Sequence, residues 1–350
     1  MAFELTDLAA LREAGFDAII DVRSPTEFAE DHVPGATSLP VLSDEERARV
    51  GTIYVQDSPF KARKLGAALV ARNAAQHLET VLAEKGGGWR PLVYCWRGGQ
   101  RSGAFASILQ QIGWRAETLM GGYQSYRRLV VRSLYDHAFP APVVVLDGNT
   151  GTAKTRLLAR LKARGVQVID LEALAQHRGS ALGAYQGQPS QKAFETALAA
   201  EVAALNPGAP VVVEAEGSRV GALNMPPALW MAMRSAPRVE ISAPLEARVA
   251  FLVEAYDDMR ADPEALCARL RYLVSRQGHA RVESWCALAR DGAFAALARE
   301  LIVHHYDPGY AKVRVQVEAP RQVVSAEALD AAGLEALADR VIEAVQNARR

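Results

Sequence analysis

The chain has 350 residues with 40 basic and 40 acidic side chains, so its formal net charge is zero, and half of its residues are hydrophobic. This length favours two domains, and the composition is that of an ordinary soluble globular protein. The sequence lacks an apolar stretch of signal-peptide or membrane-spanning length, so we expect a cytoplasmic protein that does not enter a membrane.

The first predicted elements lie in the N-terminal third of the chain. An apolar run over residues 18–22 predicts a strand. A second apolar run, residues 91–94, is followed by a glycine-rich turn and by a helical pattern from residue 104. A strand, a turn and a helix in this order are typical of a parallel α/β sheet, in which the turn lies at the carboxyl end of the strand.

The turn after residues 91–94 begins with Cys95. Backbone N–H groups of such a turn, together with the N-terminus of the next helix, form an anion-binding nest, and the same field lowers the pKa of a thiol. A buried structural cysteine is the alternative, but it would need neither the arginines nor the glycines that follow. We therefore predict that Cys95 is catalytic. The predicted oxyanion loop consists of Trp96, Arg97, Gly98, Gly99, Gln100 and Arg101.

The two other cysteines, Cys267 and Cys286, lie in helical patterns and are predicted to be core residues. The spacing of the three cysteines predicts neither a disulfide framework nor a zinc site.

A proline-bearing segment, residues 137–142, is the predicted linker to a second strand–loop–helix unit, with its strand at 143–146 and its helix at 156–161. The loop between them has the spacing of a Walker A phosphate loop, except that Ala153 stands where the last glycine is expected. We predict that Lys154 reaches the terminal phosphates of a ligand and that Thr155 holds Mg²⁺. The predicted diphosphate-binding residues are Gly148, Asn149, Thr150, Gly151, Thr152, Ala153, Lys154 and Thr155.

Acidic residues follow the next two predicted strands, 166–169 and 211–213. Asp170 and Glu172 follow the first strand, and Glu214 and Glu216 follow the second. Each could position Mg²⁺ or water beside the phosphate loop, or cap the next helix. We rank Glu214 and Glu216 first and keep Asp170 as a further candidate.

The rest of the chain completes an α/β pattern. Short apolar runs predict strands at 239–241 and 313–317, and helical periodicity covers 191–204, 245–300 and 326–347.

Residues 4–137 resemble the rhodanese superfamily, on segments 21–28, 31–36 and 120–126. Common single-domain rhodaneses place four residues between the cysteine and the loop arginine, whereas Cys95 and Arg101 enclose five. The wider loop suggests phosphate, selenophosphate or arsenate rather than a single sulfane sulfur. The resemblance implies a rhodanese-like parallel-sheet domain over 1–138. A P-loop NTPase-like α/β domain would follow over 139–350, with a helical insertion near 245–300 and a C-terminal helix near 326–347.

The combination of both loops resembles the tRNA 2-selenouridine synthase family over nearly the whole chain, on segments 95–101, 170–180, 189–195, 214–218 and 306–310. This resemblance implies that a transferase converts wobble 2-thiouridine in the anticodon arm of tRNA to 2-selenouridine through an S-geranyl intermediate. Geranyl diphosphate and selenophosphate would be co-substrates, Mg²⁺ could assist, and no cofactor would be bound permanently. Selenophosphate would bind the Cys95 loop, and geranyl diphosphate would bind the phosphate loop.

The local distribution of charge is compatible with an RNA partner, although the net charge of the chain is zero. Three stretches, 85–135, 140–169 and 266–281, contain many arginines and almost no acids, and such fields attract polyanions. Solvated arginine on helix faces is the alternative. The predicted tRNA contacts are Arg127, Arg128, Arg269, Arg271 and Arg276.

Two smaller predictions concern apolar side chains. Trp96 and Tyr123 are candidate stacking platforms for an unstacked base. The methionine-rich run 223–233 could line a slot for an isoprenoid, although a core helix is the better interpretation.

Two other functions stay open on the sequence. The chain could be a rhodanese-type sulfurtransferase or phosphatase-like enzyme with a regulatory P-loop module, which would turn over thiosulfate or aryl phosphates without RNA. It could also be a non-catalytic adaptor in which both loops only bind anions. The oligomeric state is unknown from the sequence.

Overall fold

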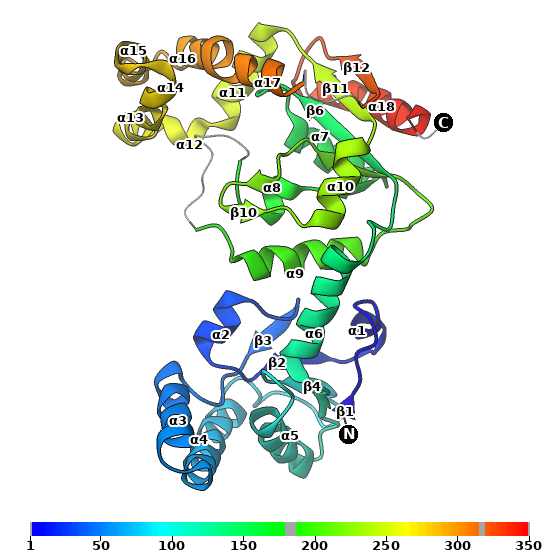
Figure 1. Cartoon of the computed structure of the whole chain (residues 1–350), viewed down its shortest axis with the longest axis vertical. Helices are drawn as coiled ribbons and strands as arrows, with labels where there is room; N and C mark the ends of the chain where they lie inside the picture. Colours follow the sequence, from blue (N-terminus) through cyan, green and yellow to red (C-terminus); the bar gives the residue numbers. More distant parts are fainter. Residues whose placement is uncertain (1, 179–186, 315–318, 349–350) are drawn as a thin grey trace. The chain divides into compact units, whose positions relative to one another are not determined.

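The structure is a computed structural model that describes residues 2–178, 187–314 and 319–348, and it contains two compact α/β units (Figure 1). Unit 1 comprises Met1–His137 and Pro189–Ala204. Unit 2 comprises Ala138–Gln188 and Leu205–Arg350. Both units contain an all-parallel five-stranded sheet, as the α/β prediction requires.

The sheet of unit 1 has the strand order β1-β5-β4-β2-β3. Its central strand is buried along its whole length, because its side chains are apolar on both faces of the sheet. The strands are β1 (Ala2–Phe3), β2 (Ala18–Asp21), β3 (Ala36–Ser38), β4 (Pro91–Tyr94) and β5 (Glu117–Leu119). The helices are α1 (Ala10–Glu13), α2 (Pro25–Glu30), α3 (Asp44–Gln56), α4 (Pro59–Glu79), α5 (Gln100–Ile112), α6 (Gly122–Val131), the π-helix η1 (Arg132–Asp136) and α9 (Gln191–Val202).

Helix α9 is separated in sequence from the rest of unit 1, yet it supplies part of that unit's interior. Phe194, Leu198 and Ala199 are buried, and Thr196 is buried with its hydroxyl bonded to Asp31. The side chain of Ser190 caps the start of the helix by accepting from the backbone N–H of Ala193. The helix therefore completes unit 1 although the chain has already entered unit 2 before it.

The sheet of unit 2 has the order β12-β11-β6-β8-β7. Helices α7 and α18 pack their apolar faces against it around Leu157, Leu161, Leu337 and Val341. The strands are β6 (Val143–Gly148), β7 (Gln167–Ile169), β8 (Val211–Glu214), β11 (Arg238–Ser242) and β12 (Arg321–Ser325), with an antiparallel pair β9 (Arg219–Val220) and β10 (Leu223–Asn224). The helices that accompany them are α7 (Lys154–Ala163), α8 (Leu171–Leu174), α10 (Pro227–Ser235), α11 (Leu245–Ala255) and α18 (Ala331–Asn347).

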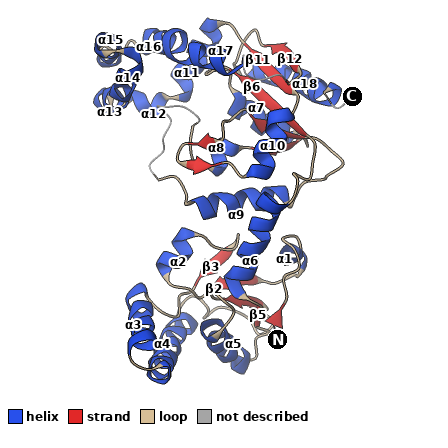
Figure 2. Cartoon of the chain, in the orientation of Figure 1, coloured by secondary structure: helices blue, strands red, loops and turns tan. Residues whose placement is uncertain are grey.

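A group of short helices follows α11 and has a core of its own (Figure 2). The predicted helical segment 245–300 is divided where Pro263, Gly278 and Gly292 lie at helix boundaries. Cys267 and Cys286 lie in this core, which confirms the prediction for both. The elements are α12 (Asp257–Arg260), α13 (Pro263–Leu270), the 3₁₀ helix η2 (Arg271–Leu273), α14 (Val274–Gln277), α15 (His279–Arg290), α16 (Phe294–Leu301), the π-helix η3 (Ile302–Tyr306) and α17 (Asp307–Arg314).

Two expectations near the C-terminus need correction. The predicted strand at 313–317 is wrong at 313–314, which belong to α17, while 315–317 lie outside the described residues. The fifth strand of the sheet is β12, which pairs with β11. The predicted helix at 326–347 begins only at Ala331, because the Asp330 carboxylate caps it by accepting from the backbone N–H of Gly333.

The described helices include none that is both long and apolar enough to cross a membrane.

Candidate functional site

Cys95 directly follows β4, and its Sγ lies 3.2 Å from the hydroxyl oxygen of Ser102 on α5. Burial would raise the pKa of the Cys95 thiol. Hydrogen bonds with the side chain and backbone of Ser102, the charge of Arg101 and the backbone of Gly99 outweigh burial, so the pKa is lowered. The residue is 4% exposed. The site therefore favours a thiolate, the reactive form of cysteine.

The start of α6 holds the cysteine loop. The backbone N–H of Tyr123 donates to the Cys95 carbonyl (2.9 Å), and that of Gln124 donates to the Trp96 carbonyl (3.0 Å). Gly122 has φ +59°, and a Cβ at this position would lie 2.3 Å from the Cys95 carbonyl oxygen. Because backbone atoms cannot move aside as a flexible side chain can, only glycine fits this close approach.

Arg101 of the cysteine loop forms an ion pair with a carboxylate. Its guanidinium donates to the carboxylate of Glu27 on α2 (2.8 Å), and Arg47 pairs with the same carboxylate (3.0 Å). Burial would raise the pKa of Glu27, but the hydrogen bond and charge of Arg101, the backbone of Ser24 and the charge of Arg47 lower it. Glu27 thus stays ionised and orients Arg101. Glu27 was not among the predicted site residues, although the Ser24–Glu27 capping box can be recognised in the sequence.

The other predicted loop residues differ in exposure. Arg97, Gly99 and Gln100 are exposed, whereas Trp96 and Gly98 are half-buried.

A buried polar network lies below the cysteine loop. The Tyr123 hydroxyl donates to Asp31 (2.5 Å), and the Thr196 hydroxyl of α9 donates to the same carboxylate oxygen (2.9 Å). The Arg23 guanidinium lies 4.0 Å from the centre of the Tyr123 ring and pairs with Asp21. Tyr123 is 1% exposed, so its prediction as a stacking platform for a base is wrong. Trp96, with its ring centre 5.3 Å from that of Tyr123, keeps an exposed part.

The predicted diphosphate-binding residues lie between β6 and α7. In the structure Lys154 Nζ donates to the Gly148 carbonyl (2.7 Å) and lies 5.8 Å from the centre of the Tyr310 ring. Ala153, at the expected glycine position, is buried and has φ +60°, the left-handed conformation that favours glycine. The backbone therefore keeps the glycine-type conformation despite the added methyl group. A cavity of about 710 Å³ opens beside Thr150–Arg156, Glu172 and Tyr310.

Arg248 and Asp307, which were not among the predicted site residues, hold this loop by hydrogen bonds. Arg248 of α11 is 5% exposed, and its Nε donates to the Thr150 carbonyl (2.9 Å). Its two terminal nitrogens donate to Asp307 of α17 (2.9 and 2.7 Å), which also accepts from Asn149 Nδ2 (2.9 Å). Asp307 lies in the segment 306–310 that carried the family resemblance, whereas no sequence signal singled out Arg248.

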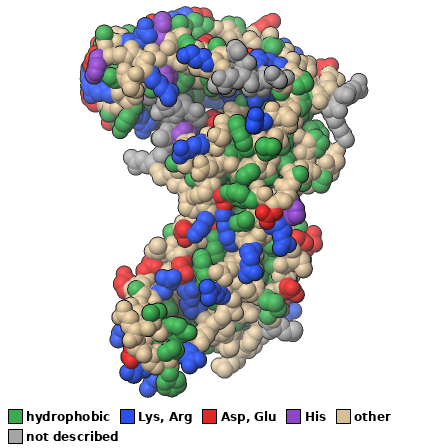
Figure 3. Space-filling view, in the orientation of Figure 1, with side chains coloured by type: hydrophobic (Ala, Val, Ile, Leu, Met, Phe, Trp, Pro, Cys, Tyr) green, Lys and Arg blue, Asp and Glu red, His purple; other side chains and the backbone are tan. Residues whose placement is uncertain are grey.

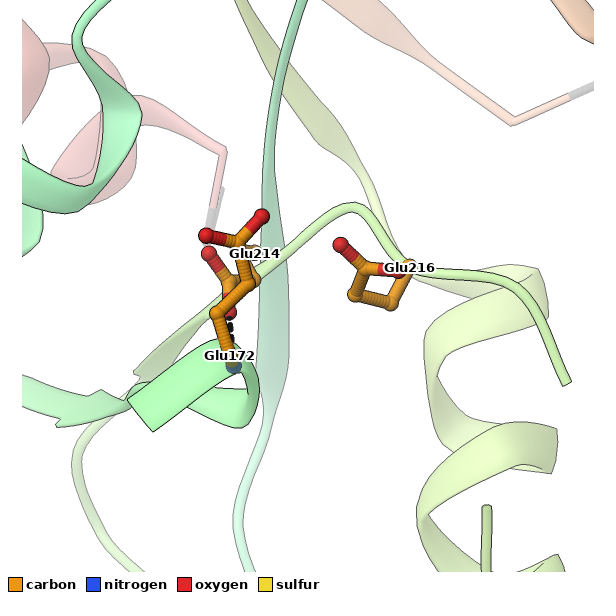
Figure 4. Close-up of side chains that lie close together, drawn as sticks. All are labelled: Glu172, Glu214 and Glu216. Carbon is orange, nitrogen blue, oxygen red and sulfur yellow. Dashed lines mark hydrogen bonds between the residues drawn. The ribbon is translucent and has the colours of Figure 1, made fainter. Parts of the chain in front are cut away.

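Three carboxylates gather beside the loop (Figure 4). Oxygen atoms of Glu172 from α8, Glu214 from the end of β8 and Glu216 from the following loop lie within 4.8 Å of one another. The backbone N–H of Glu172 donates to Glu214 Oε1 (2.5 Å). Glu214 lies beside the phosphate loop because β8 pairs with β6, with Glu214 opposite Leu146.

These carboxylates resist ionisation. Burial, followed by the negative charges of its neighbours, raises the pKa of Glu214 well above its usual range. Burial and the charge of Glu172 raise the pKa of Glu216 to about 8, and burial raises that of Glu172 although Lys154 opposes it. The buried Oε2 of Glu214 has no hydrogen-bond partner. Carboxylate oxygens and an unpaired buried oxygen fit a Mg²⁺ ion, with Thr155 Oγ1 nearby at 3.4 Å from Glu172.

Of the predicted acidic partners, the structure brings Glu214 and Glu216 into this cluster, together with Glu172. Asp170 instead caps α8 by accepting from the backbone N–H of Ala173 (2.9 Å). Residues 179 and 180 of the segment 170–180 lie outside the described residues.

The five candidate tRNA contacts lie in different environments. Arg127 is half-buried and pairs with Glu195 of α9, whereas Arg128 is exposed. Arg271 pairs with Glu283 (3.4 Å), Arg269 is half-buried and Arg276 is exposed. On the face drawn in Figure 3, Lys and Arg side chains are interspersed with Asp and Glu side chains on both units.

The methionine-rich run 223–233 mainly builds core. Met225, Leu229 and Met233 are buried, and Met231 is exposed on α10. This agrees with the core-helix interpretation.

Comparison with known families matches two regions of the chain. A family model described as "Rhodanese-like domain" matches residues 4–129, and one described as "tRNA 2-selenouridine synthase AAA domain" matches residues 141–269.

Three curated relatives are similar to this chain, and each is named tRNA 2-selenouridine synthase. The protein from Bdellovibrio bacteriovorus is 36% identical over 66% of this chain and 62% of its own length. That from Nitrosomonas europaea is 37% identical over 72% of this chain and 66% of its own length, so the chain spans less than two thirds of these two relatives. That from Hahella chejuensis is 34% identical over 84% of both chains.

Proposed function

Since this chain belongs to the tRNA 2-selenouridine synthase family, we propose that it is a transferase that converts wobble 2-thiouridine in tRNA to 2-selenouridine, through an S-geranyl intermediate. Geranyl diphosphate is the proposed donor for the first step, and selenophosphate is the proposed donor for the second.

One observation supports this proposal above the others: the chain carries two anion sites of different chemistry. The Cys95 loop combines a thiol of lowered pKa with backbone donors and arginines. The loop at 148–155 combines Lys154 with a cavity of about 710 Å³ and three carboxylates. A monoanionic or dianionic selenium donor suits the first site, and a diphosphate suits the second.

In the first step, the sulfur of 2-thiouridine attacks the C1 carbon of geranyl diphosphate. A carbon–sulfur bond forms, the carbon–oxygen bond breaks, inorganic diphosphate leaves with the electron pair, and the N3 proton of the base is released to solvent. Lys154 and the backbone N–H groups of the loop stabilise the charge that develops on this leaving group. Arg248 and Asp307 keep the loop in place, because they bond to Thr150 and Asn149.

Glu172, Glu214 and Glu216, with Thr155, would hold a Mg²⁺ ion near the diphosphate. When bound, such an ion neutralises part of the charge on phosphate oxygens.

In the second step, the selenium of selenophosphate adds to C2 of the alkylated base, and geranylthiol leaves. Water then cleaves the selenium–phosphorus bond, so the products are 2-selenouridine, geranylthiol and phosphate. Alkylation matters because it turns the thiocarbonyl sulfur into a good leaving group. The Cys95 loop would bind the phosphate part of the donor, with Arg101 oriented by Glu27.

The test uses a strain in which the gene is deleted, grown with selenite. Nucleosides from its tRNA should lack 2-selenouridine, the wild-type gene should restore it, and the Cys95→Ala variant should not. If 2-selenouridine persists in the deletion strain, the proposed function is wrong.

A further inference from the structure

An apolar pocket lies beside the phosphate loop in unit 2, between α11 and the short helices that follow it. Its hydrocarbon lining comes from several elements and is half-buried or buried. The residues that form most of this lining are Leu252, Met259, Leu266, Phe294, Leu297 and Leu301. Met259, Leu266, Phe294, Leu297 and Leu301 also belong to, or pack against, the core of the helical group. The pocket thus lies between α11 and the core of the helical group.

This pocket adjoins the cavity beside the loop at 148–155. Thr150, Leu252 and Tyr256 line both. Thr150 is itself part of the phosphate loop, and a Cβ on the neighbouring Gly151 would lie 3.1 Å from Leu252 Cγ. A ligand with its phosphates on the loop would therefore find hydrocarbon side chains immediately beyond Thr150.

We infer that this pocket binds the hydrocarbon chain of an isoprenoid diphosphate whose diphosphate group occupies the loop at 148–155. This inference rests on the proposed function and assigns the geranyl chain to named residues. The chemistry of the lining carries it: an apolar chain gains by leaving water, whereas the polar edges of a nucleobase would lose hydrogen bonds that these side chains cannot replace.

The alternative site for the chain was the methionine-rich run 223–233. Its Met225 and Met233 are buried in the fold, and neither lines the phosphate cavity. The pocket near Thr150 shares that residue with the loop at 148–155, so a single amphiphilic ligand could contact both.

The pocket itself is small, about 80 Å³, against about 710 Å³ for the adjoining cavity. It can hold only the end of a ten-carbon chain, and Phe251, Leu252 and Ala255 line the cavity through which the rest of the chain would run.

Helix α16 offers a matched pair of variants for the test. Ala298 lines the pocket, whereas Ala296 is exposed on the same helix. Ala298→Phe should fill the pocket without removing a core side chain, and Ala296→Phe adds the same ring to the outer surface. Binding of geranyl diphosphate and of inorganic diphosphate to the full chain is measured by isothermal titration calorimetry with Mg²⁺.

Ala298→Phe should weaken the binding of geranyl diphosphate by about tenfold or more, which is the effect of losing the burial of roughly two methylene groups. The affinity for inorganic diphosphate should not change. Ala296→Phe should change neither affinity. If Ala298→Phe binds geranyl diphosphate as the wild type does, the pocket assignment is overturned while the proposed function stands. If the wild type binds geranyl diphosphate no more tightly than inorganic diphosphate, both are overturned.

A second measurement does not depend on the folding of a variant. A geranyl diphosphate analogue with a photoreactive group at the end of its chain is cross-linked to the wild-type protein, and the modified peptides are sequenced. Labelling within 252–266 or 294–301 supports the assignment, and labelling confined to 223–233 contradicts it.

Discussion

At the scale of single residues, the reactivity of Cys95 depends on its neighbours on α5. The Ser102 hydroxyl, 3.2 Å from Sγ, is the first of the contacts that oppose the effect of burial on the thiol. Without it, fewer contacts would oppose burial, which raises the pKa of a thiol because a thiolate in an apolar environment loses solvation.

Ser102→Ala should therefore raise the pKa of Cys95 and slow its reaction at neutral pH. The rate of alkylation by iodoacetamide, followed against pH with mass spectrometry of the Cys95 peptide, reports this pKa. Ser107→Ala on the same helix is the control, because Ser107 bonds only to the Gly103 carbonyl among the contacts described. An unchanged pH profile in Ser102→Ala would show that the hydroxyl has no such role.

The three carboxylates near the phosphate loop predict a pH dependence for Mg²⁺. The pKa of Glu216 is about 8, above its ordinary value of 4.5, so the folded protein binds an extra proton between these pH values. Stability without metal should accordingly fall as the pH rises from about 5 to about 8. Mg²⁺ must displace this proton, so its affinity should rise by up to about tenfold per pH unit over the same range.

Calorimetric titration with Mg²⁺ between about pH 6 and about pH 8 measures this slope. Glu216→Gln, which has no proton to release, should give a shallower one. A wild-type affinity that does not change with pH would argue against a metal at this cluster.

The sequence singles out the candidate residues of both loops, because they lie within short contiguous segments, 95–101 and 148–155. The residues that support them come from elsewhere in the chain. Glu27 approaches Arg101 across 74 positions, and Arg248 approaches Thr150 across 98. Glu172 lies next to Glu214 because α8 starts beside the end of β8. The two residues are 42 positions apart in the sequence, so the sequence does not reveal this contact.

At the scale of elements, the loop at 148–155 and α7 form one structural unit. The Lys154 side chain extends from the first residue of α7 toward the Gly148 carbonyl, and it can exchange this carbonyl for a phosphate oxygen.

Lys154→Ala should weaken diphosphate binding by about 10- to 100-fold, the range for a hydrogen bond to a charged group. Geranylated tRNA should then disappear, while conversion of tRNA geranylated beforehand should continue. Chromatography of nucleosides after each separate reaction measures both steps. Lys162→Ala, near the other end of α7, should impair neither, and equal loss of both steps in Lys154→Ala would point to a structural or tRNA-binding role.

Sequence patterns predicted the buried strands better than the peripheral ones. Strands β4, β6 and β8 are continuous apolar runs because both of their faces are covered. Strand β12 was missed because only Val324 among its residues is buried, and the short strands β1, β3 and β5 have too few residues for a pattern.

At the scale of the whole molecule, α9 belongs to unit 1 although it follows the first part of unit 2 in the sequence. The sequence predicts a boundary at 138/139, whereas unit 1 consists of two segments, Met1–His137 and Pro189–Ala204. Helical periodicity predicted α9 itself, but periodicity does not show against which of the two units the apolar face of the helix packs. The partners of α9, such as Asp31 and Arg127, lie far from it in sequence.

A fragment of residues 1–137 should consequently be less stable than unit 1 within the intact chain. Loss of Phe194 and Leu198 alone removes about 3 kcal/mol or more of apolar burial. Urea unfolding followed by circular dichroism, with and without a synthetic peptide of residues 187–206, measures the difference. The peptide should stabilise the fragment, and a fragment that is equally stable without it would contradict this account.

The same path of the chain constrains how the protein is made on the ribosome. Unit 1 cannot close over Asp31 until the chain as far as Ala204 has been synthesised, and β6, the loop at 148–155 and β7 are synthesised before that point. At about 5–20 residues per second, the roughly 70 residues after His137 occupy several seconds of translation. During that interval the surface awaiting Phe194 is open and the sheet of unit 2 still lacks β8, so the nascent chain offers two unfinished apolar surfaces to chaperones at once.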